Sequence, residues 1–208
     1  MTKKISSILA EGRCQGIGKD YVPFYLAEEA RSRGTASRIY DPIEGRFIHT
    51  MSKTESLFYY HLRGDPDVRH IREQYLLRDE LMQEIKKSLG IHDSGKNYTT
   101  DFLVDYNDGS QRAFCVKFTN DLFTEDSPRY AGRHNAYVKL CNRVTLERTY
   151  WEALGVEFFI ITREMLNRTF AANICSLLRA WTPDDDPSLD MKTLYLIAHG
   201  YIDADLVS

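Results

Sequence analysis

A strong hairpin pattern in the middle of the chain constrains the fold more than any other segment. The runs Tyr98–Tyr106 and Arg112–Phe118 are both predicted to form strands. Between them lies Asn107-Asp108-Gly109, a sequence that favours a tight turn. The sequence therefore predicts two neighbouring strands that pair in a hairpin.

Two charged side chains lie on this predicted hairpin, Asp101 on the first strand and Lys117 on the second. Because side chains alternate across a strand, Cys115 and Lys117 share one face while Val116 points to the other. Asp101 and Lys117 can then meet near one end of the hairpin. One carboxylate by itself is a poor site for Mg²⁺, which needs several hard oxygen ligands, so further ligands have to come from elsewhere in the chain.

Composition is that of an ordinary soluble protein. The 208 residues, 43% of them hydrophobic, can bury one full core with room for a small appendage. No run approaches the roughly 18 apolar residues that span a bilayer, and Met1–Leu9 lacks the apolar core of a signal peptide. We therefore expect a cytoplasmic protein without membrane contact. The cysteines are widely spaced and form no Cys-x-x-Cys pair, which predicts neither a zinc knuckle nor a disulfide framework: Cys14, Cys115, Cys141 and Cys175.

The net charge of −3 argues against a strongly basic protein that holds nucleic acid through phosphate contacts alone. Any role on DNA would have to be local or assisted. The glycine-rich stretch Glu11–Gly18 is predicted to be a loop, and it is not a phosphate-binding loop because no Gly-Lys-Ser/Thr follows.

Helices and further strands are predicted on both sides of the central hairpin. The Asp-Pro and Gly of Asp41–Gly45 predict a turn between two short strands. The remaining patterns predict the following elements: strands Arg38–Tyr40 and Arg46–His49, helix Ser56–Leu62, strand Val68–Leu77, helix Asp79–Leu89 ended by Gly90, helix His134–Leu154 ended by Gly155, and strand Val156–Thr162, whose apolar run predicts cover on both faces.

The C-terminal part differs in character. Asn167–Trp181 and Leu189–His199 are predicted helices, separated by the acidic, proline-bounded linker Thr182–Pro187. This is too little chain for a large second domain. We expect a catalytic domain over residues 1–166 and a short helical region over residues 167–208, available for docking to a partner.

The predicted order gives an α/β fold, a mixed sheet flanked by helices, with Glu55, Asp101 and Lys117 near the ends of elements. This is the layout of metal-dependent phosphodiesterases, in which carboxylates bind Mg²⁺ and a lysine orients water or stabilises developing charge. Each residue also has a purely structural interpretation. Ser52-x-x-Glu55 is a capping box, Asp101 could be a turn residue at a strand end, and Lys117 a solvated strand residue.

Several motifs, in order, resemble the TnsA family, the endonuclease subunits of heteromeric bacterial transposases, across nearly all of residues 11–181. The matching pieces are EGRCQGIGKDYVPF (Glu11–Phe24), SRIYDPIEGRFIHTMSKTE (Ser37–Glu55), IREQ (Ile71–Gln74), TDFLVD (Thr100–Asp105), VK (Val116 and Lys117), LERTYW (Leu146–Trp151) and FFIIT (Phe158–Thr162).

The resemblance implies a fold like that of type II restriction endonucleases. It also implies that Glu55, Asp101 and Lys117 are catalytic, with Glu147 as a further acidic residue of the site. The alternative for Glu147 is a surface position on a helix, where Arg143 or Arg148 would pair with it.

What the resemblance implies about function is more specific. The family nicks DNA at the 5′ ends of a mobile element with Mg²⁺, for which Mn²⁺ can substitute, while a TnsB-like transposase cuts and joins the 3′ ends. Members of the family also contact a TnsC-like ATPase regulator, chiefly through their own C-terminal part. The expected partners are therefore double-stranded DNA at transposon ends and these two proteins.

The chain departs from the family pattern in two places. Cys115 stands where the family commonly has Gln. A thiol is a soft ligand that suits Mg²⁺ poorly, so we expect metal ligands from Glu55, Asp101 and the backbone carbonyl of Val116. The C-terminal region is also shorter than the family can carry, which weakens the case for DNA binding by that part.

Three functions follow as hypotheses. The first is an Mg²⁺-dependent endonuclease that acts at transposon ends within a transposase complex. The second is a catalytically silent assembly factor that bridges the transposase and its ATPase regulator, with Cys115 as a trace of decay. The third is a free-standing nuclease of the restriction type, which would cut DNA without partners.

Overall fold

A computed structural model describes residues 5–30, 35–92, 97–119, 124–181, 197 and 205–206. Within them, β1 and β2 form a two-stranded sheet, and a four-stranded sheet has the order β3-β4-β5-β6. The strands are β1 (Ser37–Asp41), β2 (Arg46–Thr50), β3 (Val68–Leu76), β4 (Thr99–Tyr106), β5 (Gln111–Lys117) and β6 (Glu157–Thr162). The α-helices are α1 (Ile5–Ala10), α2 (Lys53–Arg63), α3 (Asp79–Leu89), α4 (His134–Ala153) and α5 (Arg168–Arg179), and four short 3-10 helices are η1 (Gly18–Asp20), η2 (Ala27–Glu29), η4 (Pro128–Tyr130) and η5 (Arg163–Met165).

The larger sheet is mixed, as predicted. β3 pairs with β4 and β4 with β5 in antiparallel fashion, while β5 pairs with β6 in parallel. A parallel pair needs a long crossover between its strands, and α4 lies on the connection from β5 to β6. The fold class predicted from the sequence, an α/β mixed sheet flanked by helices, is confirmed.

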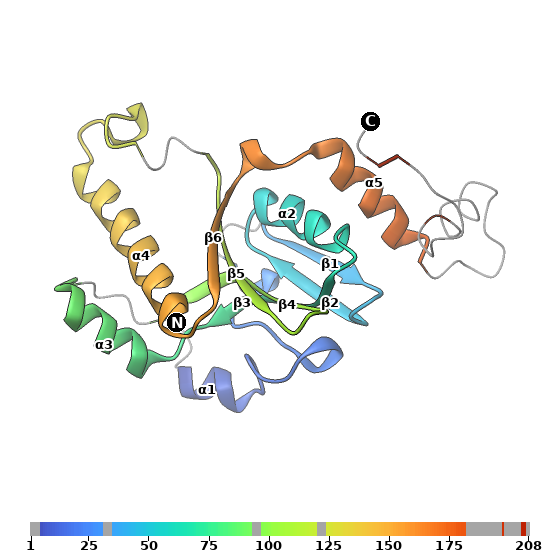
Figure 1. The fold of residues 1–208 in the computed structure, drawn as a ribbon, viewed down its shortest axis with the longest axis horizontal. Coiled ribbons are helices and arrows are strands. Elements are labelled where there is room, and N and C mark those ends of the chain that lie inside the picture. The colour runs from blue at the N-terminus through green and yellow to red at the C-terminus, as the bar shows by residue number, and fades with distance from the viewer. Residues whose placement is uncertain are drawn as a thin grey trace.

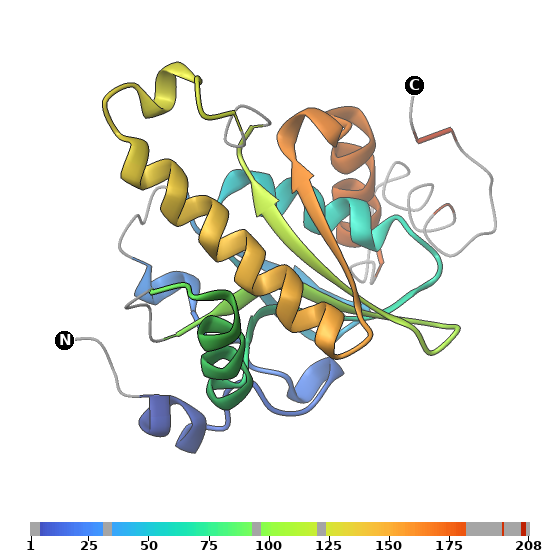
Figure 2. The same ribbon diagram turned by 60° about the vertical axis from the view of Figure 1, so that its left-hand side comes forward.

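Helices cover both faces of this sheet, as Figures 1 and 2 show. On one face α3 and α4 pack over a cluster that includes Leu103, Leu146 and Trp151. On the other face α2 and α5 pack over a cluster that includes Phe58, Phe102 and Phe114. The alternation of β4 between Phe102 and Leu103 thus feeds two separate cores.

The predicted burial of the last strand on both faces is wrong. Among the described strands, β6 lies at the edge of the sheet and borders β5 alone. Phe159 stacks on Phe114 with ring centroids 5.5 Å apart and is still 39% exposed. An edge strand has a neighbour on one side only, so a continuous apolar run does not guarantee full burial.

Helix α5 belongs to the same core as the sheet. Its residues Ile174, Leu177 and Leu178 pack with those of α2. Gly64 lets the two helices approach, because a Cβ at Gly64 would lie 2.3 Å from Phe170 Cζ. The domain boundary at residue 166 stays a prediction. The predicted linker Thr182–Pro187 and the predicted helix Leu189–His199, apart from Ile197, lie outside the described residues.

A buried ionic cluster fastens the β1–β2 hairpin to α2 and β3. Arg63 donates to Asp41 (2.5 Å) and to Glu44 (2.7 Å), and Arg46 binds both carboxylate oxygens of Glu73 (2.9 and 2.8 Å). All five side chains are less than a tenth exposed. Charges this deep are tolerated only when they are paired, so the cluster fixes the relative positions of the three elements.

Among the described helices, none is both long enough and apolar enough to cross a bilayer.

Candidate active site

The site lies where the central sheet opens between β4 and β5. Backbone pairing between these strands ends at Phe102 and Phe114. Beyond that point β4 continues to pair with β3 as far as Thr99, and β5 continues to pair with β6 as far as Lys117. The two middle strands therefore separate, and the gap between them has to be filled by side chains.

Asp101 fills this gap. Its Oδ2 accepts a hydrogen bond from the backbone N–H of Val116 at 2.6 Å, replacing the missing backbone partner. The N–H and C=O of one strand residue point to the same side, so the carbonyl of Val116 also faces the gap. The aspartate side chain is 20% exposed, which leaves it within reach of a substrate.

Lys117 meets Asp101 as the sequence predicted. Its Nζ lies 3.7 Å from Asp101 Oδ2 and donates to the carbonyl of Val116 at 3.1 Å. Burial is the largest single influence on the Lys117 pKa and lowers it, but the neighbouring acidic groups, Asp101 first among them, together outweigh burial and raise the pKa. The ammonium therefore stays charged at neutral pH and is held in place by two partners.

Glu55 reaches the site from the first turn of α2. Ser52 caps this helix by accepting from the Glu55 N–H at 3.1 Å, and it donates from Oγ to Glu55 Oε1 at 2.8 Å. The backbone N–H of Met51 donates to Glu55 Oε2 at 2.8 Å. The capping role is thus confirmed, and it coexists with a buried carboxylate that is only 6% exposed.

Gln74 is a residue of the site to which the sequence analysis assigned no role. Its Nε2 donates to Glu55 Oε2 at 3.2 Å, and the side chain is nearly fully buried. The register of β3 and β4 places it opposite Asp101, where its φ of 48° lies in the left-handed region. A residue other than glycine rarely adopts this conformation, and strained backbone of this kind gathers at functional sites. The IREQ motif contained this residue, but a left-handed φ cannot be read from it.

Glu147 reaches the site from α4, on the face of the sheet opposite to α2. It is 3% exposed, and its Oε1 accepts from Thr100 Oγ1 at 2.8 Å. Trp151 Nε1 in turn donates to the same Thr100 oxygen at 2.7 Å. The alternative of a surface helix position for Glu147 is wrong, because the register of α4 turns this residue toward the sheet next to Asp101.

The carboxylates of the site shift one another's pKa values. The pKa of Glu55 is raised to about 7, first by burial and next by the charge of Asp101. The pKa of Glu147 is raised to about 7 by the same two causes in the same order. Three carboxylates thus face one ammonium, leaving an excess of negative charge at the opening of the sheet.

The excess of negative charge and the oxygen donors are of the kind that bind a hard divalent cation such as Mg²⁺. Within the described residues, no group of three His, Cys, Asp or Glu side chains is placed to hold a metal ion. Mg²⁺ does not require such a group, since it usually keeps several waters and takes only one or two protein carboxylates. Asp101, Glu55 and the Val116 carbonyl, the ligands predicted from the sequence, could together supply such a partial set.

Cys115 is buried beside this cluster, 1% exposed. Burial, reinforced by the charges of Glu147 and Asp101, raises its pKa well above the usual value for a thiol. Because the thiolate is the form that binds metals and attacks electrophiles, this side chain is inert at neutral pH. Its role in the structure is packing.

Comparison with known proteins bears on the same residues. Residues 65–163 match the family described as TnsA-like endonuclease N terminal. The chain is also 30% identical over 176 residues to the transposon Tn7 transposition protein TnsA of Escherichia coli. Together these two matches support a protein of the TnsA family. The alignment covers 82% of this chain and 60% of that relative, so the chain spans about three fifths of the length of the TnsA it matches.

The TnsA match includes three of the four predicted site residues, Asp101, Lys117 and Glu147. Glu55 lies before residue 65, where the family match begins, and reaches the site through the packing of α2 against the sheet. All four come from different elements, and the fold gathers them at one opening of the sheet.

Proposed function

We propose that this chain is the endonuclease subunit of a transposase, which uses Mg²⁺ to nick DNA at the 5′ ends of a mobile element. One observation carries the proposal. Four side chains predicted to be catalytic, drawn from α2, β4, β5 and α4, converge where the β4–β5 pairing ends, and Asp101 and Lys117 lie in contact there.

The chemistry of phosphodiester hydrolysis explains why such a group is useful. A bound Mg²⁺ would polarise the scissile phosphate and make a bound water a stronger nucleophile. Lys117, fixed by Val116 and Asp101, would hold a positive charge beside the phosphate oxygens as negative charge develops there. With a pKa of about 7, Glu55 and Glu147 could each accept or release a proton near neutral pH.

The proposal extends to the expected partners. A partner transposase of the TnsB type would process the 3′ ends, and a TnsC-like ATPase would regulate the assembly. Double-stranded DNA at the transposon ends is the proposed substrate, and residues 167–208 are a proposed docking region for a partner protein.

Substitution of Asp101 tests the nuclease role. We expect Asp101→Ala to fold and to abolish 5′ strand nicking in a reaction reconstituted with the partner transposase, Mg²⁺ and transposon-end DNA. Asp108→Ala, at the exposed turn of the same hairpin, is the matched control and should nick normally. Retained nicking by Asp101→Ala would refute the assignment.

A catalytically silent assembly factor is the second candidate. It is favoured by Cys115 in place of the family's usual Gln, and by the lack of a three-residue metal-ligating group within the described part of the chain. Titration of Mn²⁺ into the purified chain separates the two candidates, because only the nuclease should show binding that Asp101→Ala removes.

A further inference from the structure

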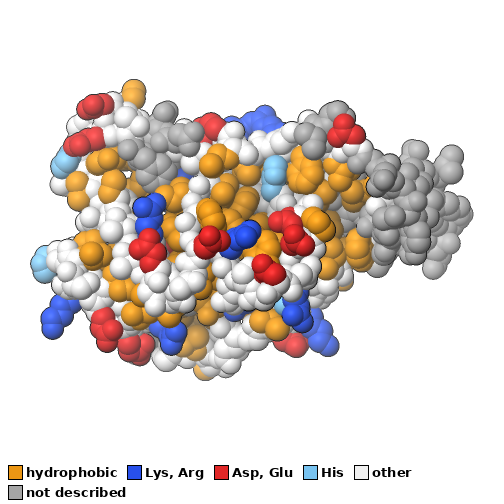
Figure 3. All heavy atoms as spheres, in the orientation of Figure 1, with side chains coloured by type: hydrophobic (Ala, Val, Ile, Leu, Met, Phe, Trp, Pro, Cys, Tyr) orange, Lys and Arg blue, Asp and Glu red, His pale blue; other side chains and the backbone are white. Residues whose placement is uncertain are grey.

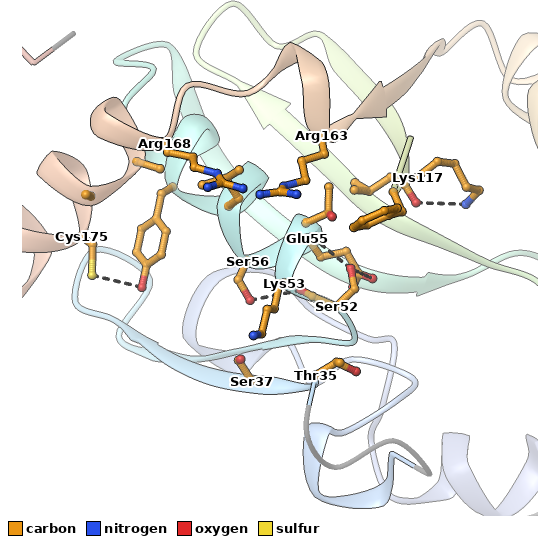
Figure 4. A pocket seen from close by; sticks show the side chains of 17 residues that line it. Thr35, Ser37, Ser52, Lys53, Glu55, Ser56, Lys117, Arg163, Arg168 and Cys175 are labelled. Carbon is orange, nitrogen blue, oxygen red and sulfur yellow. Dashed lines mark hydrogen bonds between the residues drawn. The ribbon is translucent and has the colours of Figure 1, made fainter. Parts of the chain in front are cut away.

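A cleft of about 1040 Å³ extends from the candidate active site along α2 toward α5. Glu55, Val116 and Lys117 line one end of it, and further residues of α2 and α5, together with Arg163 of η5, line most of the rest. Figure 4 shows this cleft from close by. Whatever occupies it lies directly against the residues proposed to cut DNA.

The cleft carries cations that the proposed chemistry does not use. Lys53 lies at the start of α2, Arg163 in η5, and Arg168 at the start of α5. In Figure 4 the guanidinium groups of Arg163 and Arg168 point toward one another over the cleft. Lys53 and Arg168 are exposed and Arg163 is half-buried. Among the described residues that line the cleft, Glu55 is the sole carboxylate.

The charge balance of the active site makes such cations necessary. Glu55, Asp101 and Glu147 together outweigh Lys117, and the chain as a whole carries a net charge of −3. Acidic and basic side chains are interspersed over the face shown in Figure 3. A polyanion would be repelled from the site itself, so its attraction has to come from a local group of positive charges beside it.

We propose that Lys53, Arg163 and Arg168 hold backbone phosphates of the DNA duplex on one side of the scissile bond, and so guide the strand into the opening between β4 and β5. This inference rests on the proposed function for its substrate. The arrangement favours DNA over an acidic protein segment because the three cations share one cleft with Glu55 and Lys117. They would act on any DNA sequence, since phosphate contacts position a duplex without reading bases.

The test measures DNA binding without cleavage, so it does not depend on the nuclease being active. The full chain is titrated into a fluorescein-labelled duplex in EDTA, starting at low salt, and fluorescence anisotropy gives Kd across a salt series. One variant carries Lys53→Ala, Arg163→Ala and Arg168→Ala. The matched control carries three exposed cations outside the cleft changed to alanine, Arg69, Lys87 and Lys139.

Each phosphate contact contributes about 0.9 to the slope of log Kd against log salt concentration. We therefore expect the cleft variant to bind more weakly at low salt and to lose about 2.7 from this slope, while the control keeps the wild-type slope. Equal slopes in the two variants would overturn the inference, as would a wild-type chain that does not bind the duplex even at low salt. If the cleft variant binds DNA like the control but loses binding to polyaspartate, the cleft serves an acidic protein segment and the inference is wrong.

The binding test and the nicking test can fail independently of one another. A reduced salt slope in the cleft variant together with absent nicking by the wild-type complex would leave the DNA path intact and refute the nuclease. Normal nicking together with unchanged slopes would support the nuclease and refute the DNA path through the cleft.

Discussion

Because the three carboxylates repel one another, we expect the stability of Asp101→Asn to fall less than that of the wild type between pH 4 and pH 8, while the substitution removes nicking. An acid whose pKa is higher in the folded than in the unfolded state binds more protons when folded. Stability therefore falls as pH rises from the unfolded value through the folded one. For Glu55 and Glu147 this window runs from 4.5 to about 7, and above it the full penalty is present.

The magnitude follows from these shifts. A rise from 4.5 to about 7 corresponds to about 3 kcal/mol for each carboxyl group, at 1.36 kcal/mol per pKa unit. Burial is the larger cause and the charge of Asp101 the second in both cases. If Asp101 accounts for about a quarter of each rise, removal of its charge removes about 2 kcal/mol of repulsion at pH 8 and almost nothing at pH 4.

Urea unfolding in metal-free buffer at pH 4, 6 and 8 measures this difference. Asn can still accept the hydrogen bond from Val116. The substitution also removes the ion pair with Lys117, which lowers stability at every pH tested, so the change in stability between pH values reports the repulsion. Asp126→Asn, at an exposed loop position, is the control and should follow the wild type. The reasoning fails if Asp101→Asn and the wild type lose the same stability between pH 4 and pH 8. Added Mg²⁺ should stabilise the wild type at pH 8 and not the variant, since a ligand that binds only the folded state stabilises it.

Further substitutions test the support around the site. Gln74→Leu removes a donor to Glu55, so the pKa of Glu55 should rise further. The acidic limb of the pH profile for nicking should then move to higher pH. An unmoved limb would show that Gln74 has no positioning role. Arg63→Met leaves buried Asp41 without its cation and Glu44 with the more distant Arg46, 3.9 Å away, and should cost about 3–5 kcal/mol in denaturant unfolding. A loss below about 1 kcal/mol would show that the ionic cluster contributes little. Gly64→Ala forces a Cβ against the ring of Phe170 and should lower the unfolding free energy by about 1–3 kcal/mol, and an unchanged midpoint would mean that the two helices can move apart freely.

Where a structural feature is specified by adjacent residues, the sequence predicted it well. Helix α3 begins at Asp79 and ends at Leu89 as expected, because Gly90 adopts the left-handed φ of 65° that closes a helix. The β1–β2 hairpin and the β4–β5 hairpin also form at their predicted turns. Turn and capping residues act on the backbone within a few positions, so their effect survives without knowledge of the fold.

Part of the site was predicted from local sequence patterns, and part came from the resemblance to TnsA. The alternation of side chains was enough to bring Asp101 and Lys117 together on one hairpin. Glu55 was predicted as a site residue from its place near the end of an element, and Glu147 only through the resemblance to TnsA. Nothing near either residue in sequence reveals which face of α2 or α4 turns toward the sheet. The failed prediction for β6 has the same origin, because an apolar run does not say how many neighbours a strand will have.

The sequence by itself determined most of the elements, the resemblance to TnsA and the chemical types of the site residues. Only the tertiary structure decided that β4 and β5 separate beyond Phe102, that Gln74 takes a left-handed conformation opposite Asp101, and that α5 joins the core and brings Arg168 to the cleft. These features depend on strand order and on contacts between residues far apart in the chain. Their energies come from packing and from charges brought together by the fold, which no local pattern encodes.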